Sequence, residues 1–453
     1  MLKIHSKEIR SVGFLGLGKS NLGVLEYLSR HSSELSVTVR SHKPVRADAY
    51  SPSRVFFGND ALCSIDEDVL FISPSARRDT PELQAAKRSG VILYSDAELF
   101  FEKKRADVYA VTGSDGKSTT AYLTSKLLSD GYRESVACGN IGRALSPYLD
   151  SSDGAAYVTE LSSFQLNYLK PKSERCLITN VTKNHLNWHT SFEEYINAKR
   201  NVFESGKNRI INYDCEISRK IAKDYNIFAV FSTENDEKKL KSFIKADLYI
   251  TLCNGYITAL GEPLLKMGDI KLQGKHNILN FMSAIALSYG LYKKDTLTAL
   301  AREFGGLPHR CELVGALNGV SYYDSSIDSS PKRCSATLGM LGDGLTVILG
   351  GRSKGLDFSE LMPTLRKRAK RVIITGECGK EIEDALLSDA KASGSTIPYK
   401  LIDDFYKALD YAVSTSQSGD KVVLSPAATS YDNFANFEER GDAFKLFLKS
   451  KGI

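Results

Sequence analysis

The chain has 453 residues, of which 42% are hydrophobic and 25% charged, the composition of a globular protein long enough for about three domains. A formal net charge of +6 is too small to indicate a nucleic-acid partner, and no run of about 18 apolar residues predicts a membrane span. The N-terminus has no recognisable secretion signal and the 8 cysteines form no Cys-x-x-Cys pair, so we expect reduced thiols in a cytoplasmic protein.

Strand-like and helical segments alternate along the chain, which predicts an α/β fold with parallel, doubly wound sheets. We expect three domains, with boundaries at residues 1–105, 106–307 and 308–453. The first and the last are expected to be Rossmann-like. The central one is expected to hold a mostly parallel sheet of the P-loop ATPase type.

The first block begins with a buried strand that runs into a Gly16-x-Gly18 turn and a helix, as in Rossmann folds. However, Asn21 occupies the third glycine position of the dinucleotide fingerprint. Arg40 and Ser41 stand where an acid would hold the ribose of NAD. We therefore interpret the block as Rossmann-like without a dinucleotide site.

The second block carries the strongest motif, Gly113-Ser-Asp-Gly-Lys-Ser-Thr-Thr120, after an apolar strand and before a helix expected to begin near Thr119. Its glycines let backbone N–H groups close on anionic oxygens, Lys117 adds positive charge, and the Ser118 hydroxyl can reach Mg²⁺. Val111 stands where the longer P-loop pattern has a glycine, so the loop is a shortened one. The motif predicts a nucleotide site.

Three further residues follow strands or lie on a helix of the same block. Glu160 ends the strand at residues 155–159, and His185 follows the strand at residues 175–181. At the carboxyl edge of a parallel sheet both side chains could bind Mg²⁺. The alternatives are a glutamate that faces solvent and a histidine with a structural hydrogen bond. Lys199 lies on a helical pattern, where a surface charge is the common interpretation.

Together these elements resemble the Mur ligase family, and the resemblance extends along essentially the whole chain. Further matching segments are Gly139–Gly142, Gly274–Asn280, Pro308–Glu312 and Asp324. The resemblance implies ATP contacts from Gly113, Ser114, Asp115, Gly116, Lys117, Ser118, Thr119, Asn277, Arg310 and Asp324. It also implies two Mg²⁺ ions held by Ser118, Glu160, His185 and a carbamylated Lys199, with Lys117, Glu160, His185 and Lys199 as the catalytic residues.

Within the family, three longer segments are similar to the members that add D-glutamate to UDP-N-acetylmuramoyl-L-alanine: residues 160–166, 349–358 and 424–441. That likeness implies ATP-driven amide formation through an acyl phosphate, in the synthesis of peptidoglycan precursors by a monomer. UDP-substrate contacts are then expected from Lys19, Ser20, Ser73, Asn140, Ser162 and Gln165. D-glutamate contacts are expected from Lys354, Ser430 and Phe437, with either Asp328 or Ser329 as a further partner.

The chain also departs from the family pattern at several positions. Asn184 and Asn187 flank His185 where members often carry aspartates, and Ser41 replaces an acid expected near the uridine. The Asp324–Pro331 segment replaces the family's Asp-Ser-Lys-Ala-Thr-Asn pattern. Two other functions therefore stay open at this point, a ligase of the folylpolyglutamate synthase type and a catalytically silent nucleotide-binding regulator.

Overall fold

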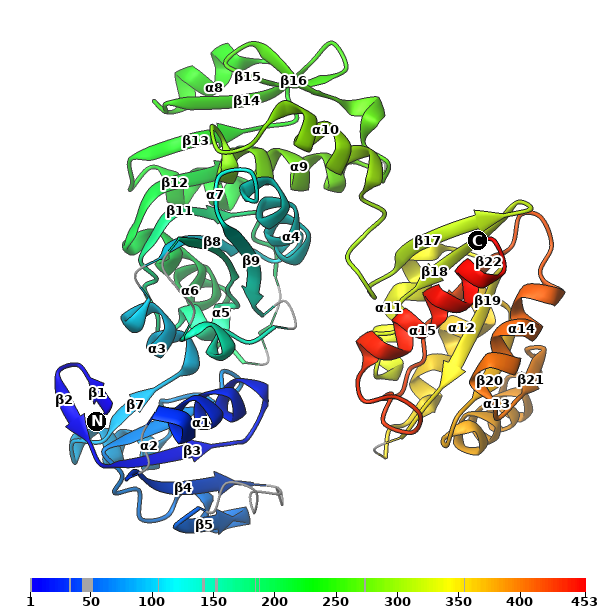
Figure 1. The fold of residues 1–453 in the computed structure, drawn as a ribbon, viewed down its shortest axis with the longest axis horizontal. Coiled ribbons are helices and arrows are strands. Elements are labelled where there is room, and N and C mark those ends of the chain that lie inside the picture. The colour runs from blue at the N-terminus through cyan, green and yellow to red at the C-terminus, as the bar shows by residue number, and fades with distance from the viewer. Residues whose placement is uncertain are drawn as a thin grey trace. The chain divides into compact units, whose positions relative to one another are not determined.

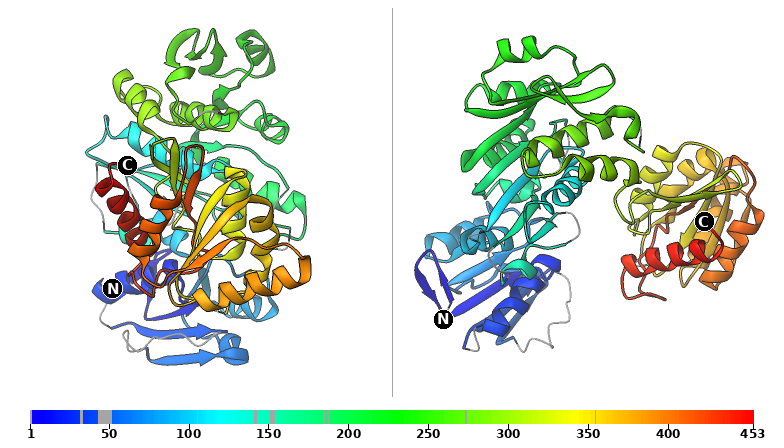
Figure 2. Two further views of the ribbon diagram at one scale, coloured as in Figure 1. Left: turned by 90° about the vertical axis from the view of Figure 1, so that its right-hand side faces the viewer. Right: turned by 45° about the horizontal axis from the view of Figure 1, so that its top comes forward.

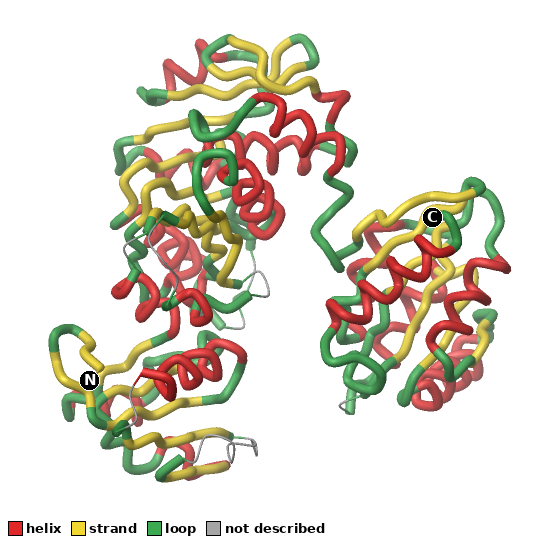
Figure 3. The backbone as a smooth tube through the Cα atoms, viewed as in Figure 1, coloured by secondary structure: helices red, strands yellow, loops and turns green. Residues whose placement is uncertain are grey.

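The computed structural model describes residues 2–31, 34–42, 52–104, 106–140, 143–150, 154–183, 185–186, 188–272, 274–353 and 355–453. The chain divides into two compact units, Met1–Glu303 and Phe304–Ile453 (Figure 1). Helices and strands alternate through both units, as the sequence predicts (Figure 3). Within the described ranges, no helix is both long and apolar enough to cross a lipid bilayer.

The first unit opens with a hairpin and a fully parallel sheet in the order β5-β4-β3-β6-β7. Numbered along the chain, these strands follow the 3-2-1-4-5 order of doubly wound folds, which confirms the Rossmann-like prediction. The strands are β1 (Leu2–Ile4), β2 (Lys7–Ile9), β3 (Ser11–Leu15), β4 (Ser36–Ser41), β5 (Arg54–Phe57), β6 (Val69–Ile72) and β7 (Ile92–Tyr94). The helices are α1 (Lys19–His31), α2 (Pro81–Arg88) and α3 (Asp96–Lys103), with a 3₁₀ turn at Gly58–Leu62.

The second sheet has the order β16-β15-β14-β13-β12-β11-β8-β10-β9 and is parallel from β9 to β14. Its strands are β8 (Asp107–Thr112), β9 (Glu134–Gly139), β10 (Ala155–Glu160), β11 (Ser173–Ile178), β12 (Gly206–Asn212), β13 (Ile227–Phe231), β14 (Leu248–Cys253), β15 (Tyr256–Ala259) and β16 (Glu262–Lys266). Its helices are α4 (Lys117–Leu128), α5 (Ser163–Leu166), α6 (Phe192–Glu204), α7 (Glu216–Ala222), α8 (Glu237–Phe243), α9 (Lys275–Ser288) and α10 (Lys294–Glu303). Helices α4 and α9 pack side by side (Figure 2).

The second unit holds one sheet in the order β17-β18-β22-β19-β20-β21, parallel except for the β17–β18 pair. Its strands are β17 (Glu312–Leu317), β18 (Val320–Asp324), β19 (Leu345–Gly350), β20 (Ala369–Thr375), β21 (Tyr399–Leu401) and β22 (Lys421–Leu424). Its helices are α11 (Pro331–Leu341), α12 (Met362–Arg368), α13 (Gly379–Ser393), α14 (Phe405–Thr415) and α15 (Phe437–Ser450). The α/β class with three mostly parallel sheets is thus confirmed.

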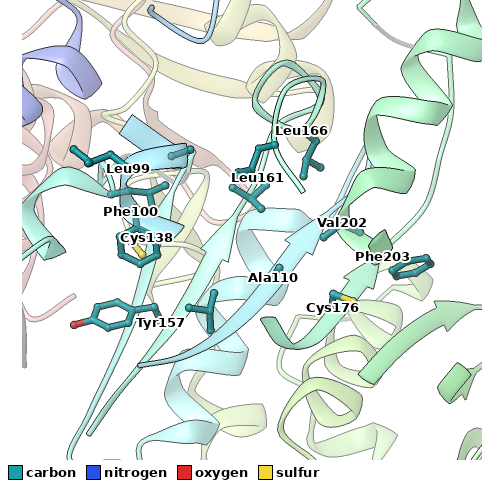
Figure 4. Packing of buried hydrophobic residues seen from close by; sticks show 14 of the residues in the cluster. Leu99, Phe100, Ala110, Cys138, Tyr157, Leu161, Leu166, Cys176, Val202 and Phe203 are labelled. Atoms are coloured by element: carbon teal, nitrogen blue, oxygen red, sulfur yellow. The ribbon is translucent and has the colours of Figure 1, made fainter. Parts of the chain in front are cut away.

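A continuous apolar core joins the two sheets of the first unit. Phe100 on α3 meets Tyr157 on β10 edge to face, with ring centroids 5.6 Å apart. Leu99 and Cys138 are buried in the same cluster (Figure 4). Because apolar burial contributes roughly 25 cal/mol per Å², this seam of large side chains holds the first sheet firmly to the second.

Arg40, which stands where a dinucleotide-binding fold has its ribose acid, is fully buried and serves the fold. Its guanidinium donates to Glu67 at 2.8 Å and to the carbonyl oxygens of Ala61, Cys63 and Ser64. Asn21 acts similarly at the first turn, where its amide donates to Gly16 O at 2.7 Å. Arg40 and Asn21, two of the residues that break the dinucleotide pattern, therefore satisfy backbone carbonyls.

We expect Arg40→Met to destabilise the protein by about 3 kcal/mol or more, because Glu67 would lose its buried cation and keep only the longer contact with Arg54 at 3.5 Å. The double variant Arg40→Met/Glu67→Leu should recover part of that loss, since the unpaired charge is gone. Urea unfolding followed by circular dichroism measures both. Arg30→Met is the matched control, because the Arg30–Asp150 pair is largely exposed and is worth under about 1 kcal/mol. Equal losses in Arg40→Met and Arg30→Met would contradict the assignment.

Candidate active site

The phosphate loop connects β8 to α4 through two glycines in conformations that other residues rarely adopt. Gly113 has a φ of 150° and Gly116 has a φ of 79°. A Cβ at Gly113 would overlap Thr179 Oγ1, and one at Gly116 would overlap Asn280 Oδ1. The helix begins at Lys117, two residues before the predicted start near Thr119. The backbone therefore turns tightly enough to present its N–H groups at the helix N-terminus, the arrangement that binds phosphate.

Side chains from the neighbouring strand end hold this loop in shape. Thr179 Oγ1 donates to Asp115 O at 2.6 Å, and the Asp115 N–H donates to Asn180 Oδ1 at 2.9 Å. Ser114 Oγ shares a hydrogen bond with Tyr195 Oη at 2.8 Å. The sequence predicts Ser114 and Asp115 at the nucleotide, but the prediction missed Thr179 and Tyr195. Thr179 could have been found as a hydroxyl directly after a strand, and Tyr195 as an aromatic residue one turn before Lys199.

Glu160 lies directly beside the phosphate loop. Ser118 Oγ donates to Glu160 Oε2 at 2.6 Å, and Asn140 Nδ2 donates to Glu160 Oε1 at 3.1 Å. The Glu160 side chain is buried. A carboxylate and a hydroxyl oxygen at a phosphate loop form the donor set that Mg²⁺ takes in nucleotide sites, so these residues fit the metal implied by the family. Asn140, predicted as a UDP-substrate contact, is bonded to this carboxylate.

Lys199 on α6 is 2% exposed, and its Nζ donates to Gly113 O at 2.6 Å. It forms no ion pair among the described residues, and its Nζ lies 4.7 Å from the centre of the Tyr195 ring. Burial and the positive charge of Lys117 lower the pKa of Lys199 well below 10.5, against weaker opposite effects of Glu160 and Asp115. The surface-charge interpretation is therefore wrong for Lys199, and its surroundings shift the amine toward its neutral form.

His185 has a left-handed backbone with a φ of 55° and packs its ring against Phe164, with centroids 4.9 Å apart. Partial burial, then repulsion from Lys199 and Lys117, lowers the pKa of His185. The His185 ring also lies 6.3 Å from the Tyr195 ring, centre to centre, and Tyr195 bonds the phosphate loop, so His185 lies at the same edge of the sheet as this loop. Asn184 and Asn187, the two departures beside His185, lie outside the described residues.

The remaining candidates of the first unit lie at ends of secondary structure. Lys19 and Ser20 open α1, and Ser73 follows β6 with its Oγ 3.3 Å from Ser75 Oγ. Ser162 and Gln165 form a capping box at α5, in which each side chain bonds the other residue's backbone N–H. The nucleotide candidates Thr119 and Asn277 lie in the first turns of α4 and α9.

In the second unit, Asp324 ends β18 fully buried, where its carboxylate pairs with His309 Nδ1 at 2.9 Å. Asp328 is also buried and accepts a hydrogen bond from Ser425 Oγ at 2.8 Å. The other predicted residues of this unit are Arg310 just before β17, Ser329 before α11, Ser430 after β22 and Phe437 at the start of α15. Lys354 lies outside the described residues.

We expect Gly113→Ala to lower ATP affinity at least about tenfold, because the new methyl group displaces Thr179 and with it the support of the loop. Gly90→Ala is the control, since Gly90 also has a positive φ, of 98°, but has open space where a Cβ would stand. Isothermal titration with ATP measures both. An unchanged affinity in Gly113→Ala would show that the loop tolerates the displacement.

The lowered pKa of Lys199 also predicts a pH dependence of stability. In the unfolded chain the amine titrates near 10.5, whereas in the folded chain it loses its proton at lower pH. The unfolded state therefore binds more protons between these two pKa values, and stability rises with pH across that window. Relative to Lys199→Met, the wild type in CO₂-free buffer should gain stability as pH rises toward 10.5. Urea unfolding of both proteins at several pH values tests this, and parallel curves would contradict it.

Two family models match the chain: the Mur ligase middle domain over residues 111–288, and the Mur ligase, glutamate ligase domain over residues 309–428. UDP-N-acetylmuramoylalanine--D-glutamate ligase from Acetivibrio thermocellus is 34% identical over 463 residues, covering 99% of this chain and 97% of that protein. The same-named ligase from Ruminiclostridium cellulolyticum is 34% identical over 468 residues and covers 99% of both chains. The solved UDP-N-acetylmuramate-alanine ligase from Thermotoga maritima aligns at 18% identity and a TM-score of 0.49, covering 97% of this chain and 99% of its own. The chain belongs to the Mur ligase family.

Proposed function

We propose that this protein is an ATP-dependent ligase that joins D-glutamate to UDP-N-acetylmuramoyl-L-alanine during the synthesis of peptidoglycan precursors. The observation that carries the proposal is the 34% identity along the full length of ligases named for this reaction. The intact group of Lys117, Glu160, His185 and Lys199 supports it. A regulator without activity would have no need of a lysine buried at the phosphate loop.

The reaction brings two anions together, so neutralising and positioning them is the main task of the site. The acceptor carboxylate attacks the γ-phosphorus of ATP and gives an acyl phosphate and ADP. The D-glutamate amine then attacks the acyl carbon, and phosphate leaves. Backbone N–H groups of the loop from Gly113 to Thr119 and the Lys117 ammonium hold the nucleotide phosphates in this scheme.

Two Mg²⁺ ions would supply further positive charge at the reacting phosphate. Ser118 and Glu160 would hold one of them, and His185 with a carbamylated Lys199 the other. Carbamylation needs a neutral amine, because only its lone pair attacks CO₂, and burial already favours that form at Lys199. The amine adds to the carbon of CO₂ and releases one proton, which gives an anion that attracts Mg²⁺, whereas the ammonium form would repel it.

We propose domains of residues 1–105, 106–307 and 308–453. In the last of these, Arg310 and Asp324 are proposed as nucleotide contacts, and Lys354, Ser430 and Phe437 as D-glutamate contacts. Between the two remaining candidates we favour Ser329, because the Asp328 carboxylate is buried against Ser425 and would repel a dicarboxylate.

Phosphate release tests this proposal directly. With ATP and Mg²⁺, release should require both UDP-N-acetylmuramoyl-L-alanine and D-glutamate, and L-glutamate should not replace D-glutamate. Lys199→Ala should lose at least about a thousandfold in rate, and acetate should restore part of the rate by supplying a carboxylate where the carbamate stood.

Lys199→Arg is the control for that rescue, since its guanidinium fills the space and carries no carboxylate. A folylpolyglutamate-type ligase would release phosphate with a folate acceptor instead. Nucleotide binding without turnover on either acceptor would refute the ligase proposal and favour a regulator.

A further inference from the structure

Trp188 is the single tryptophan of the chain and lies three residues after His185. It contacts Ser75 and Arg77, which follow strand β6 of the first sheet. Its indole Nε1 donates to Ser75 O at 2.9 Å. The Trp188 carbonyl oxygen accepts a hydrogen bond from Arg77 Nη1 at 2.6 Å, and the Arg77 guanidinium lies 5.0 Å from the centre of the indole ring. Trp188 therefore holds the loop that carries His185 by two hydrogen bonds, one from its indole and one to its carbonyl oxygen, and by a cation–π contact with Arg77.

Arg77 also binds the helix that carries Lys199. Its Nη2 pairs with Glu194 Oε1 at 3.1 Å, and Glu194 lies in the first turn of α6. The Glu194 carboxylate in turn accepts a hydrogen bond from Thr190 Oγ1 at 2.7 Å, just before the helix. One guanidinium thus connects the segment after β6 with both elements that bear the proposed metal-binding residues. We call Ser75, Arg77, Trp188 and Glu194 the Arg77 clamp.

Two contacts connect the Arg77 clamp to His185, one through the backbone and one through Phe164. The Trp188 N–H donates to His185 O at 3.0 Å, and Phe164 packs against both rings, with centroids 4.6 Å from Trp188 and 4.9 Å from His185. A left-handed φ at a histidine costs of order 1 kcal/mol and persists only where neighbours hold it. The contacts of Trp188 are among those that hold this turn.

The other end of the clamp lies beside the proposed acceptor site. Ser75 is two residues after Ser73, a proposed contact of the UDP substrate, and the Ser73 and Ser75 hydroxyls lie 3.3 Å apart. A movement of this segment would therefore reach Trp188 directly. Arg77 also bonds the Asp79 carboxylate, with Nε 2.9 Å from Oδ1. Lysine could not replace Arg77, because one ammonium cannot reach a carbonyl, two carboxylates and a ring face as the fork of a guanidinium does.

We propose that Arg77 is a positioning residue that sets the His185 loop and α6 against the acceptor-binding segment, so that acceptor binding and metal binding reinforce one another. The proposal rests on the proposed function for the identity of the acceptor. Arg77 itself contacts neither substrate nor metal. Its contribution acts through the backbone of Trp188 and through Glu194.

Because Trp188 is the only tryptophan, its fluorescence reports on the clamp without substrate, metal or turnover. In the ligand-free protein, Arg77→Met should raise acrylamide quenching about twofold and shift emission to longer wavelength, since the indole loses its cover. Arg77→Lys should behave nearly as Arg77→Met. Arg54→Met is the matched control, because it removes an arginine–carboxylate pair of the same sheet far from Trp188 in sequence and contacts, and it should leave quenching unchanged.

Ligand titrations extend the test to coupling. Adding UDP-N-acetylmuramoyl-L-alanine should change wild-type Trp188 fluorescence at least about twice as much as that of Arg77→Met, in which only the bond to Ser75 still connects the segment to Trp188. In the phosphate-release assay, Arg77→Met should raise the Mg²⁺ concentration for half-activity roughly tenfold, the size typical of lost support behind metal ligands, with the KM for ATP unchanged. Saturating Mg²⁺ should restore most of kcat, which a merely misfolded variant would not show.

Unchanged quenching and unchanged Mg²⁺ dependence in a folded Arg77→Met protein would overturn the proposal. Trp188→Phe guards against misfolding in Arg77→Met: it keeps a ring but removes the bond to Ser75, and an unchanged Mg²⁺ requirement there would equally count against the clamp. Failure of the proposed function is distinguishable, because the wild type would then release no phosphate with this acceptor while the quenching difference between Arg77→Met and Arg54→Met remained.

Discussion

A lysine amine buried against the phosphate loop is the constraint on which the layout of this site depends. Lys199 Nζ reaches Gly113 O at 2.6 Å from the middle of α6, so the helix must pass close to the loop. An ammonium at this depth is costly without a carboxylate partner, and the described residues offer none within ion-pair distance. The same position becomes favourable once the amine is neutral or is converted to an anion beside a cation. The burial of this amine is thus compatible with the proposed carbamylation, which would turn it into such an anion.

The sheet brings the other groups to that amine through its strand order alone. Strands β11, β8 and β10 are neighbours, and Glu160 pairs in register with Val111 while Ile178 pairs with Thr112. The residues that follow these strands therefore share one edge, as carboxyl ends of parallel strands must. The sequence could therefore predict that the phosphate loop, Glu160 and the loop after β11 lie together. That prediction requires only that the three strands before them be parallel neighbours.

Other features depend on contacts that no local pattern encodes. The capping role of Ser162 and Gln165 and the bond between Asn140 and Glu160 follow from side-chain directions at strand ends, so predicted substrate contacts turned out to have partners within the protein. The contact between Arg77 and Trp188 joins positions 111 residues apart. Periodicity describes the face of one element, and it carries no information about which distant loop that face meets.

The two attachments between the sheets of the first unit differ in what they can specify. The apolar seam at Phe100 and Tyr157 supplies burial, which is strong but tolerates small rotations because dispersion has little directionality. The Arg77 clamp adds hydrogen bonds and a fork-shaped cation, whose energy falls steeply with angle and distance. An enzyme that must align an acceptor carboxylate with a phosphate within a few tenths of an ångström needs the second kind of contact as well as the first. This difference explains why partly exposed polar groups lie at a junction between sheets that apolar packing already stabilises.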